Sequence, residues 1–211
     1  PEDGSAEVNS DNPFVPYLAT LQDAIDLTPD VMLFRIDLDD TEVKANFGYK
    51  PGQFIFVSAF GTGESPFGLT SVEYRKGPLE VAVRKVGTVT SSLHELEPGA
   101  SVGVRGPFGN HFPLDDFKGK NIHIIGGGIG FAPLRPVILT ILDHRSDYGD
   151  LLILNGARTP QDLVFASEII GELEAEGFLS TEVTNLRSRL DQTIRRLRVD
   201  QLLKSARTRV E

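Results

Sequence analysis

The stretch Ile124-Ile-Gly-Gly-Gly-Ile-Gly-Phe-Ala-Pro133 decides how this chain is interpreted, because it joins an apolar run to a helical pattern through glycines. Residues 122–125 are nearly all apolar, as in a buried parallel strand. Glycines allow a sharp turn and a close approach of the backbone to a ligand. The start of the next helix offers free N–H groups to a pyrophosphate. The stretch therefore predicts a phosphate-binding turn, although a tight strand-to-helix turn without a ligand remains an alternative, and the spacing is not Gly-x-Gly-x-x-Gly.

A second unit follows from this turn. A helical pattern over residues 133–144, with Pro133 suited to its first turn, leads to the apolar run 151–154. This order predicts a strand–turn–helix–strand unit with a right-handed crossover. The loop over residues 155–162 leaves the second strand at its carboxyl end, where α/β sheets bind ligands. There Arg158 could contact a ribose or phosphate and Thr159 could cap a helix over residues 162–176, or the loop is an ordinary connection.

The pattern upstream of the turn is different. Short segments with alternating or β-branched residues are separated by turn residues, and they cover residues 31–38, 53–58, 79–84 and 101–105. This pattern is typical of a closed antiparallel barrel. One short helix interrupts it, with Thr90 or Ser91 as its cap and with Leu93 and Leu96 on its apolar side.

Two segments of the expected barrel also indicate ligand binding. In residues 83–91, Gly87 permits a turn before a hydroxyl-rich helix start, and Arg84 and Lys85 add positive charge. A capped helix without a ligand is the alternative there. In residues 65–71, Ser-Pro-Phe-Gly-Leu-Thr-Ser, apolar and hydroxyl residues could flank a flat aromatic ring. A turn followed by an edge strand is the alternative for that segment.

Composition excludes several classes of function. The 211 residues carry a formal net charge of -9, which argues against nucleic-acid partners and anionic membranes. There is no cysteine, so we expect no iron–sulfur cluster and no Cys-ligated zinc in this chain. The four histidines show no metal-ligand spacing, and neither a Gly-x-Ser-x-Gly elbow nor a Walker lysine occurs. Without a signal peptide at Pro1-Glu-Asp-Gly-Ser or an apolar stretch long enough to insert in a membrane, we expect a cytoplasmic protein.

Taken in order, these segments resemble the ferredoxin–NADP reductase superfamily, in which a flavin-binding barrel precedes a nucleotide-binding α/β domain. The likeness extends to gamma subunits of cytoplasmic nickel–iron (sulf)hydrogenases, to the equivalent subunit of anaerobic sulfite reductase, and to the electron-transfer subunit of dihydroorotate dehydrogenase. It covers residues 13–177. The motifs that carry it are Lys50-Pro-Gly-Gln-Phe54, Arg84-Lys-Val-Gly-Thr-Val-Thr90, Val104-Arg-Gly-Pro-Phe-Gly109, Gly126-Gly-Gly-Ile-Gly-Phe-Ala-Pro-Leu134 and Gly156-Ala-Arg-Thr-Pro160.

The resemblance implies a β barrel plus α/β fold: an antiparallel flavin-binding barrel, then a parallel-sheet nucleotide-binding domain, complete or truncated. The expected divisions are a disordered arm over 1–12, an FAD-binding β-barrel domain over 13–117, an NAD(P)-binding α/β domain over 118–184 and an amphipathic helical tail over 185–211. The tail has leucines at helical spacing and a basic opposite face. It could pack on its own domain or dock a partner.

The resemblance also implies the cofactor contacts, and no side chain is expected to be catalytic on its own because the flavin carries the chemistry. The segment expected along the isoalloxazine is Pro66, Phe67, Gly68, Leu69, Thr70 and Ser71. The flavin pyrophosphate would lie against Gly87, Val89, Thr90 and Ser91, with Arg84 beside them. The phosphates of the nicotinamide nucleotide would lie against Gly127, Gly128, Ile129, Gly130, Phe131, Ala132 and Pro133. Its ribose and adenine side would meet Gly156, Ala157, Arg158, Thr159 and Asp162.

The implied function is that of a diaphorase-type flavoprotein electron-transfer subunit, an NAD(P)H-dependent flavin oxidoreductase. Hydride would pass between NAD(H) or NADP(H) and FAD, and single electrons would leave to iron–sulfur centres on partner subunits of a redox complex such as a hydrogenase.

Three departures from the family pattern leave other functions open. Gly68 stands where relatives usually carry serine or threonine, and the chain has neither further βα units with a Cys-Gly-Pro-like loop nor the cysteine cluster of the named subunits. A flavin-binding structural or assembly subunit without nicotinamide turnover is therefore an alternative. A stand-alone soluble reductase is another.

Overall fold

The computed structural model describes residues 12–175. Within these residues, the chain divides into two units after Ala166. Nearly all of the expected N-terminal arm, the end of the expected α/β domain and the expected helical tail over 185–211 lie outside the described residues. Within the part that is described, no helix is long and apolar enough to cross a membrane.

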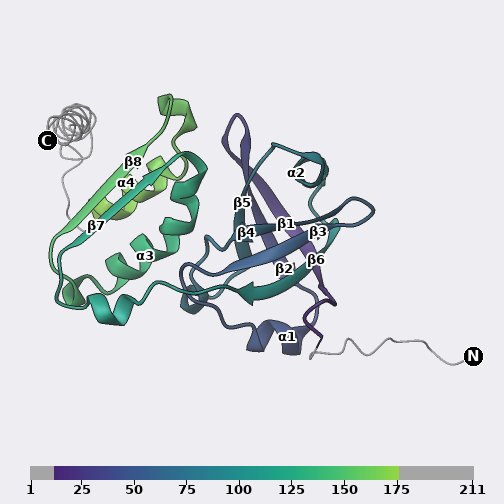
Figure 1. Cartoon of the computed structure of the whole chain (residues 1–211), viewed down its shortest axis with the longest axis horizontal. Helices are drawn as coiled ribbons and strands as arrows, with labels where there is room; N and C mark the ends of the chain where they lie inside the picture. Colours follow the sequence, from purple (N-terminus) through teal and green to yellow (C-terminus); the bar gives the residue numbers. More distant parts are fainter. Residues whose placement is uncertain (1–11, 176–211) are drawn as a thin grey trace, which may run out of the picture. The chain divides into compact units, whose positions relative to one another are not determined.

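Six antiparallel strands form the N-terminal part of the first unit (Figure 1). They follow the order β4-β3-β6-β1-β2-β5 across the sheet. Just after β4, a bridge between Leu69 and Val81 connects this edge strand to β5 at the other edge. The sheet is therefore closed, which confirms the predicted barrel. The strands are β1 (Tyr17–Thr28), β2 (Val31–Leu38), β3 (Phe54–Ala59), β4 (Gly63–Gly68), β5 (Leu79–Arg84) and β6 (Ser101–Phe108).

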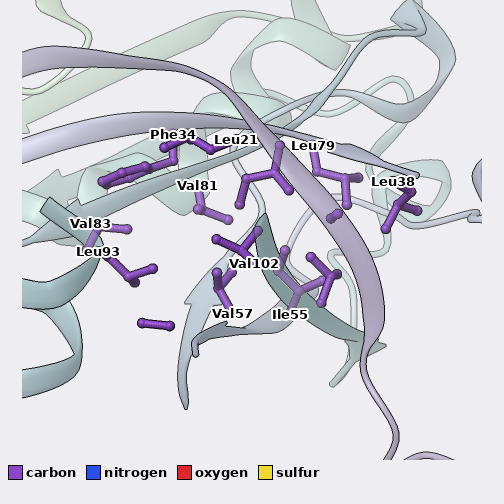
Figure 2. Packing of buried hydrophobic residues seen from close by; sticks show 14 of the residues in the cluster. Leu21, Phe34, Leu38, Ile55, Val57, Leu79, Val81, Val83, Leu93 and Val102 are labelled. Atoms are coloured by element: carbon purple, nitrogen blue, oxygen red, sulfur yellow. The ribbon is translucent and has the colours of Figure 1, made fainter. Parts of the chain in front are cut away.

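The barrel interior is filled by aliphatic side chains from all parts of the sheet (Figure 2). Leu21, Ile55 and Val81 are fully buried there, together with Leu93 from the short helix α2 (Thr88–His94). The barrel therefore has a hydrophobic core of its own. Each fully buried side chain of this kind contributes about 1.5–3 kcal/mol to the stability of the fold. Leu93 in this core confirms the predicted apolar side of α2, whereas Leu96, which also packs against the core, lies beyond the end of the helix.

Two local features of the barrel differ from expectation. α2 begins at Thr88 after the N-cap residue Gly87, so Thr90 lies inside the first turn and is not the cap. A helix that was not predicted, α1 (Thr41–Asn46), starts where the carboxylate of Asp40 accepts from the N–H groups of Glu42 and Val43. Such an acidic N-cap is the sequence signal for this helix.

The remainder of the first unit contains the predicted parallel strands β7 (Ile122–Gly127) and β8 (Leu151–Gly156). They pair along their whole length, with Ile122 opposite Leu151 and Gly127 opposite Gly156. Between them lie the 3₁₀ helix η3 (Gly128–Leu134) and the helix α3 (Arg135–Asp143). This order confirms the predicted strand–turn–helix–strand unit. Short 3₁₀ turns complete the chain trace: η1 (Glu73–Arg75), η2 (Leu114–Phe117), η4 (Arg145–Asp147) and η5 (Pro160–Asp162).

The expected helix bounds around this unit were wrong in two places. The helix after the glycines does not start at Pro133, because a 3₁₀ segment occupies residues 128–134 and Pro136, not Pro133, stands in the first turn of α3. The helix expected over residues 162–176 is α4 (Ala166–Ala175), and Thr159 precedes η5 instead. Phe165 has a φ of 56°, a left-handed conformation that interrupts a right-handed helix before α4 can begin.

Candidate functional site

Two of the predicted ligand-binding segments meet at the carboxyl ends of β7 and β8. Gly127 pairs with Gly156 in the parallel ladder, and the loop over residues 157–162 leaves from the same edge as η3. This is the edge at which α/β sheets bind ligands. Because neither glycine carries a Cβ atom, both backbones stay open at this edge.

The glycines of the turn after β7 serve different purposes. A Cβ atom on Gly126 would lie 2.8 Å from Leu134 Cδ1 and from Phe131 Cδ2, so this glycine allows η3 to fold back on the strand. Gly128 has a φ of 53°, which glycine adopts without strain. No atom lies within 4 Å of a Cβ built on Gly130. The turn thus leaves its backbone open at Gly130, as a phosphate-binding turn requires.

The predicted residues of this turn divide into exposed and buried ones. Gly127 and Gly130 are exposed, whereas Phe131 and Ala132 are 1% and 2% exposed. The side chains of Phe131 and Ala132 therefore belong to the core beneath the turn. Only their backbone lies near the open surface.

The start of α2 provides a second anion-binding geometry. Thr90 Oγ1 accepts from the N–H groups of Val86 (3.0 Å) and Gly87 (2.9 Å) and donates to the Gly87 carbonyl. The first backbone bond of the helix runs from Ser91 N–H to the same carbonyl, at 2.8 Å. The N–H groups of Thr88, Val89 and Thr90 consequently have no acceptor within the helix. They are the donors that a phosphate would use.

Arg84 lies between the barrel and the glycine turn. Its Nε is 3.2 Å from a carboxylate oxygen of Asp30, and this atom makes no hydrogen bond among the described residues. One of its terminal nitrogens is 3.8 Å from the Cβ position of Gly128. The guanidinium therefore adds positive charge beside the glycine turn, whereas the sequence placed this charge at the start of α2.

The segment expected along a flavin ring comes directly against the glycine turn. A Cβ atom on Gly68 would lie 3.0 Å from Pro133 Cβ. Pro66, Phe67 and Gly68 keep part of their surface exposed, whereas Leu69, Thr70 and Ser71 are buried. Only the first three residues of the segment thus present side chains or Cα atoms to a ligand.

The end of this segment is held by a buried polar network. Ser71 Oγ is 2.6 Å from Tyr49 Oη and accepts from the backbone N–H of Glu80 at 3.1 Å. Burial raises the pKa of the Tyr49 phenol, so Tyr49 stays neutral well above physiological pH. The hydroxyl of Ser71 therefore already has two hydrogen-bond partners within the protein.

Arg135 and Glu80 form a part of the site that the sequence interpretation missed. Arg135 Nη1 donates to the Thr70 carbonyl and to Glu80 Oε2, both at 2.6 Å. The other carboxylate oxygen of Glu80 accepts from Arg35 Nε at 2.9 Å. A lone arginine at the head of the apolar run Pro136-Val-Ile-Leu139 is the signal that could have revealed it, because arginine is rarely buried without a partner.

The loop after β8 carries the remaining predicted residues. Arg158 is largely exposed and its Nε lies 3.8 Å from Asp162 Oδ2. The same carboxylate oxygen accepts from the backbone N–H of Thr159 at 3.2 Å. Asp162 therefore holds the loop closed, and the guanidinium of Arg158 extends from it into solvent.

Comparison with protein families identifies two consecutive domains. The oxidoreductase FAD-binding domain matches residues 18–112, and the oxidoreductase NAD-binding domain matches residues 124–207. The first match covers the barrel from Leu18 onward, with the whole of α2. The second begins within β7, two residues before the glycine turn.

Two curated relatives are similar to most of this chain. Sulfhydrogenase 1 subunit gamma of Pyrococcus furiosus is 39% identical over 160 residues, which cover 76% of this chain and 55% of the relative. A probable dihydroorotate dehydrogenase B (NAD(+)) electron transfer subunit of Methanocaldococcus jannaschii is 36% identical over 152 residues, 71% of this chain and 51% of the relative. The chain thus spans about half the length of these relatives.

Solved structures show the same fold. The Amycolatopsis cytochrome P450 reductase GcoB aligns with a TM-score of 0.66 and 27% identity, over 77% of this chain and 50% of that one. A ferredoxin-NADP+ reductase from Plasmodium falciparum aligns with a TM-score of 0.65 and 17% identity, over 76% and 66%. The matched domains, their order and the glycine-lined turn agree with one another. The chain therefore belongs to the ferredoxin–NADP reductase family of oxidoreductases, in which an FAD-binding domain is followed by an NAD-binding domain.

Proposed function

We propose that this chain is the flavin- and nicotinamide-nucleotide-binding part of an electron-transfer subunit, an NAD(P)H-dependent flavin oxidoreductase. The observation that carries the proposal is the contact between Gly68 of the barrel and Pro133 of the glycine turn. It brings together one segment of the matched FAD-binding domain and one segment of the matched NAD-binding domain. Two nucleotides bound at these segments would have their reactive rings side by side.

The residues present fit both cofactors. The unpaired N–H groups of Thr88 to Thr90 suit the pyrophosphate of FAD, and the open backbone around Gly128 and Gly130 suits that of a nicotinamide nucleotide. When bound, these groups would supply the redox chemistry, a hydride transfer from the reduced nicotinamide to the oxidised flavin. The chain's own residues position the rings and exclude water from them.

We propose specific contacts within this site. The flavin ring lies along Pro66, Phe67 and Gly68 and along the backbone of Leu69 to Ser71, and its pyrophosphate is bound by Gly87, Val89, Thr90, Ser91 and the charge of Arg84. The nicotinamide nucleotide takes the turn over residues 127–133 and, on its ribose side, Gly156, Ala157, Arg158, Thr159 and Asp162. The boundary between the two domains is proposed at residues 117–118.

The partners are proposed from the relatives. Sulfhydrogenase gamma and the dihydroorotate dehydrogenase electron transfer subunit are named as subunits of larger enzymes. We propose that this chain also serves a multi-subunit redox complex in the cytoplasm and passes single electrons to iron–sulfur centres. The 211 residues contain no cysteine, so the thiolate ligands of those centres lie outside this sequence.

Purification of the full-length protein from its native host tests this proposal. We expect FAD to be released on denaturation and iron-containing subunits to co-purify. A flavin-loaded protein that NADH and NADPH leave oxidised would instead support an assembly subunit without nicotinamide turnover. A fully active monomer without iron-containing partners would contradict the electron-transfer complex and support a stand-alone reductase.

A further inference from the structure

The flavin-side segment, residues 68–71, lies along the residues that lead into α3. Gly68 meets Pro133, and two residues further along both segments the Thr70 carbonyl meets Arg135. The first contact is van der Waals and the second is a charge-assisted hydrogen bond of 2.6 Å. The glycine turn and the barrel segment are thus joined at two consecutive points.

Arg135 is part of a closed ring of interactions with Thr70 and Glu80. The N–H of Thr70 donates to the Glu80 carbonyl at 2.8 Å, while the Thr70 carbonyl and the Glu80 carboxylate both accept from Arg135 Nη1. The peptide groups on both sides of Thr70 are therefore fixed. Neither can shift without breaking a bond to Glu80 or to Arg135.

A charged side chain at this position is costly, which indicates a specific use. Thr70, Glu80 and Arg135 are 0%, 8% and 8% exposed. Removing a guanidinium from water costs several kcal/mol, and well-packed apolar residues often replace buried ion pairs without loss of stability. What an apolar side chain cannot supply is a directional bond to the Thr70 carbonyl.

At its other end, α3 also contacts the barrel, and this second contact serves as a control for that of Arg135. Asp143 accepts from Tyr74 Oη at 2.7 Å and from Arg75 Nε at 2.8 Å. These bonds are about 12 Å along the helix from Arg135, given a rise of 1.5 Å per residue. They fasten the helix to the barrel but touch neither the glycine turn nor the segment over residues 68–71.

We propose that Arg135 is a positioning residue that couples the nucleotide-binding turn to the flavin-side segment Gly68–Ser71. Arg135 follows η3 directly, so a nucleotide that orders the turn also orders the Thr70 backbone through this side chain. The segment is thereby held at the distance that hydride transfer requires. This proposal rests on the proposed function, since it assigns the two segments to two cofactors.

The test compares Arg135→Gln and Arg135→Lys with Asp143→Asn in the full-length, FAD-loaded protein. We first measure hydrogen exchange over residues 68–71 with and without NAD⁺. Nucleotide binding is expected to slow exchange there in the wild type and in Asp143→Asn, but not in Arg135→Gln. Arg135→Lys, which keeps the charge, is expected to restore part of the response.

The second readout is the rate at which NADH or NADPH reduces the flavin without oxygen. A misplacement of 1 Å can cost up to about a hundredfold in rate, so we expect Arg135→Gln to be slower by about tenfold or more. The dissociation constants for FAD and NAD⁺ are expected to stay near the wild-type values. Asp143→Asn should lose stability without this loss of rate.

The outcomes separate the two proposals. An Arg135→Gln protein with the wild-type exchange response overturns the role of Arg135, as does an Asp143→Asn protein that loses the response equally. If nucleotide binds the wild-type protein but leaves the flavin oxidised, only the proposed function fails, and the exchange response still decides on Arg135. A wild type without any exchange response to NAD⁺ overturns the Arg135 proposal.

Discussion

Gly68 and Pro133 approach so closely that a Cβ atom on Gly68 would lie 3.0 Å from the Cβ of Pro133. Real Cβ contacts are rarely this short, so a side chain at position 68 requires Pro133 to give way by a few tenths of an ångström. The backbone of Gly68 itself is in no left-handed conformation. The reason for a glycine at position 68 is therefore this close approach and not the backbone conformation.

The first prediction follows from this contact. Gly68→Ala, and more strongly Gly68→Ser, should weaken the binding of NAD⁺ by several-fold while the protein still binds FAD, because the turn is displaced. Fluorescence titration with NAD⁺ measures the effect. Gly77→Ala is the matched control, since no atom lies within 4 Å of a Cβ there. Equal affinities of Gly68→Ala and the control would show that the contact does not position the turn.

The glycines of the turn itself give the second prediction. Gly126→Ala should destabilise the fold by about 1–3 kcal/mol, as overpacking does, because its Cβ would meet Leu134 and Phe131. Gly130→Ala should change stability by less than about 0.5 kcal/mol and weaken nucleotide binding instead. Urea denaturation and NAD⁺ titration separate the two effects. Loss of stability in both variants would argue that Gly130 is also a packing residue.

Thr90 provides the third prediction. Thr90→Val keeps the shape but leaves the N–H groups of Val86 and Gly87 without their acceptor, so stability should fall by roughly 1–3 kcal/mol. The start of α2 should also bind FAD less tightly, because its first turn is less well ordered. Thr90→Ser keeps the hydroxyl and should retain most of both properties. Denaturation and FAD titration of the two variants measure this, and a Thr90→Ser as weak as Thr90→Val would assign the effect to the methyl group.

The fourth prediction concerns alkaline pH. Burial and the neighbouring Asp143 raise the pKa of Tyr74 from 10.0 to about 12. A pKa raised in the folded state stabilises the fold below pH 10 and loses that contribution as the pH rises toward 12. Tyr74→Phe should therefore remove this pH dependence. When the ionisation of the four tyrosines is followed by ultraviolet absorbance, the variant should also lack the step at the highest pH. A variant that keeps the step near pH 12 would assign it to another tyrosine.

The elements that were predicted correctly have their signal in residues that are neighbours in the sequence. The alternation over residues 79–84 coincides with β5, and the apolar runs at residues 122–125 and 151–154 lie in the paired strands β7 and β8. The glycine turn at residues 126–130 was recognisable because its chemistry is local. In each case the signal and the structure occupy the same few residues.

The features that were missed depend on residues far apart in the chain. The bond from Arg135 to Glu80 joins residues 55 positions apart. Likewise, Thr70 and Ser71 read as ligand-facing hydroxyls, although the fold buries both. Periodicity cannot show which face a coil segment turns inward, because only packing against distant elements decides it.

Anaerobic stopped-flow mixing of the purified, FAD-loaded protein with NADH and, separately, NADPH tests the proposed function most directly. We predict a yellow protein with about one FAD per chain whose flavin absorbance is bleached by at least one of the two nucleotides. A colourless protein that takes up no flavin, or a flavin that neither nucleotide bleaches, would contradict it.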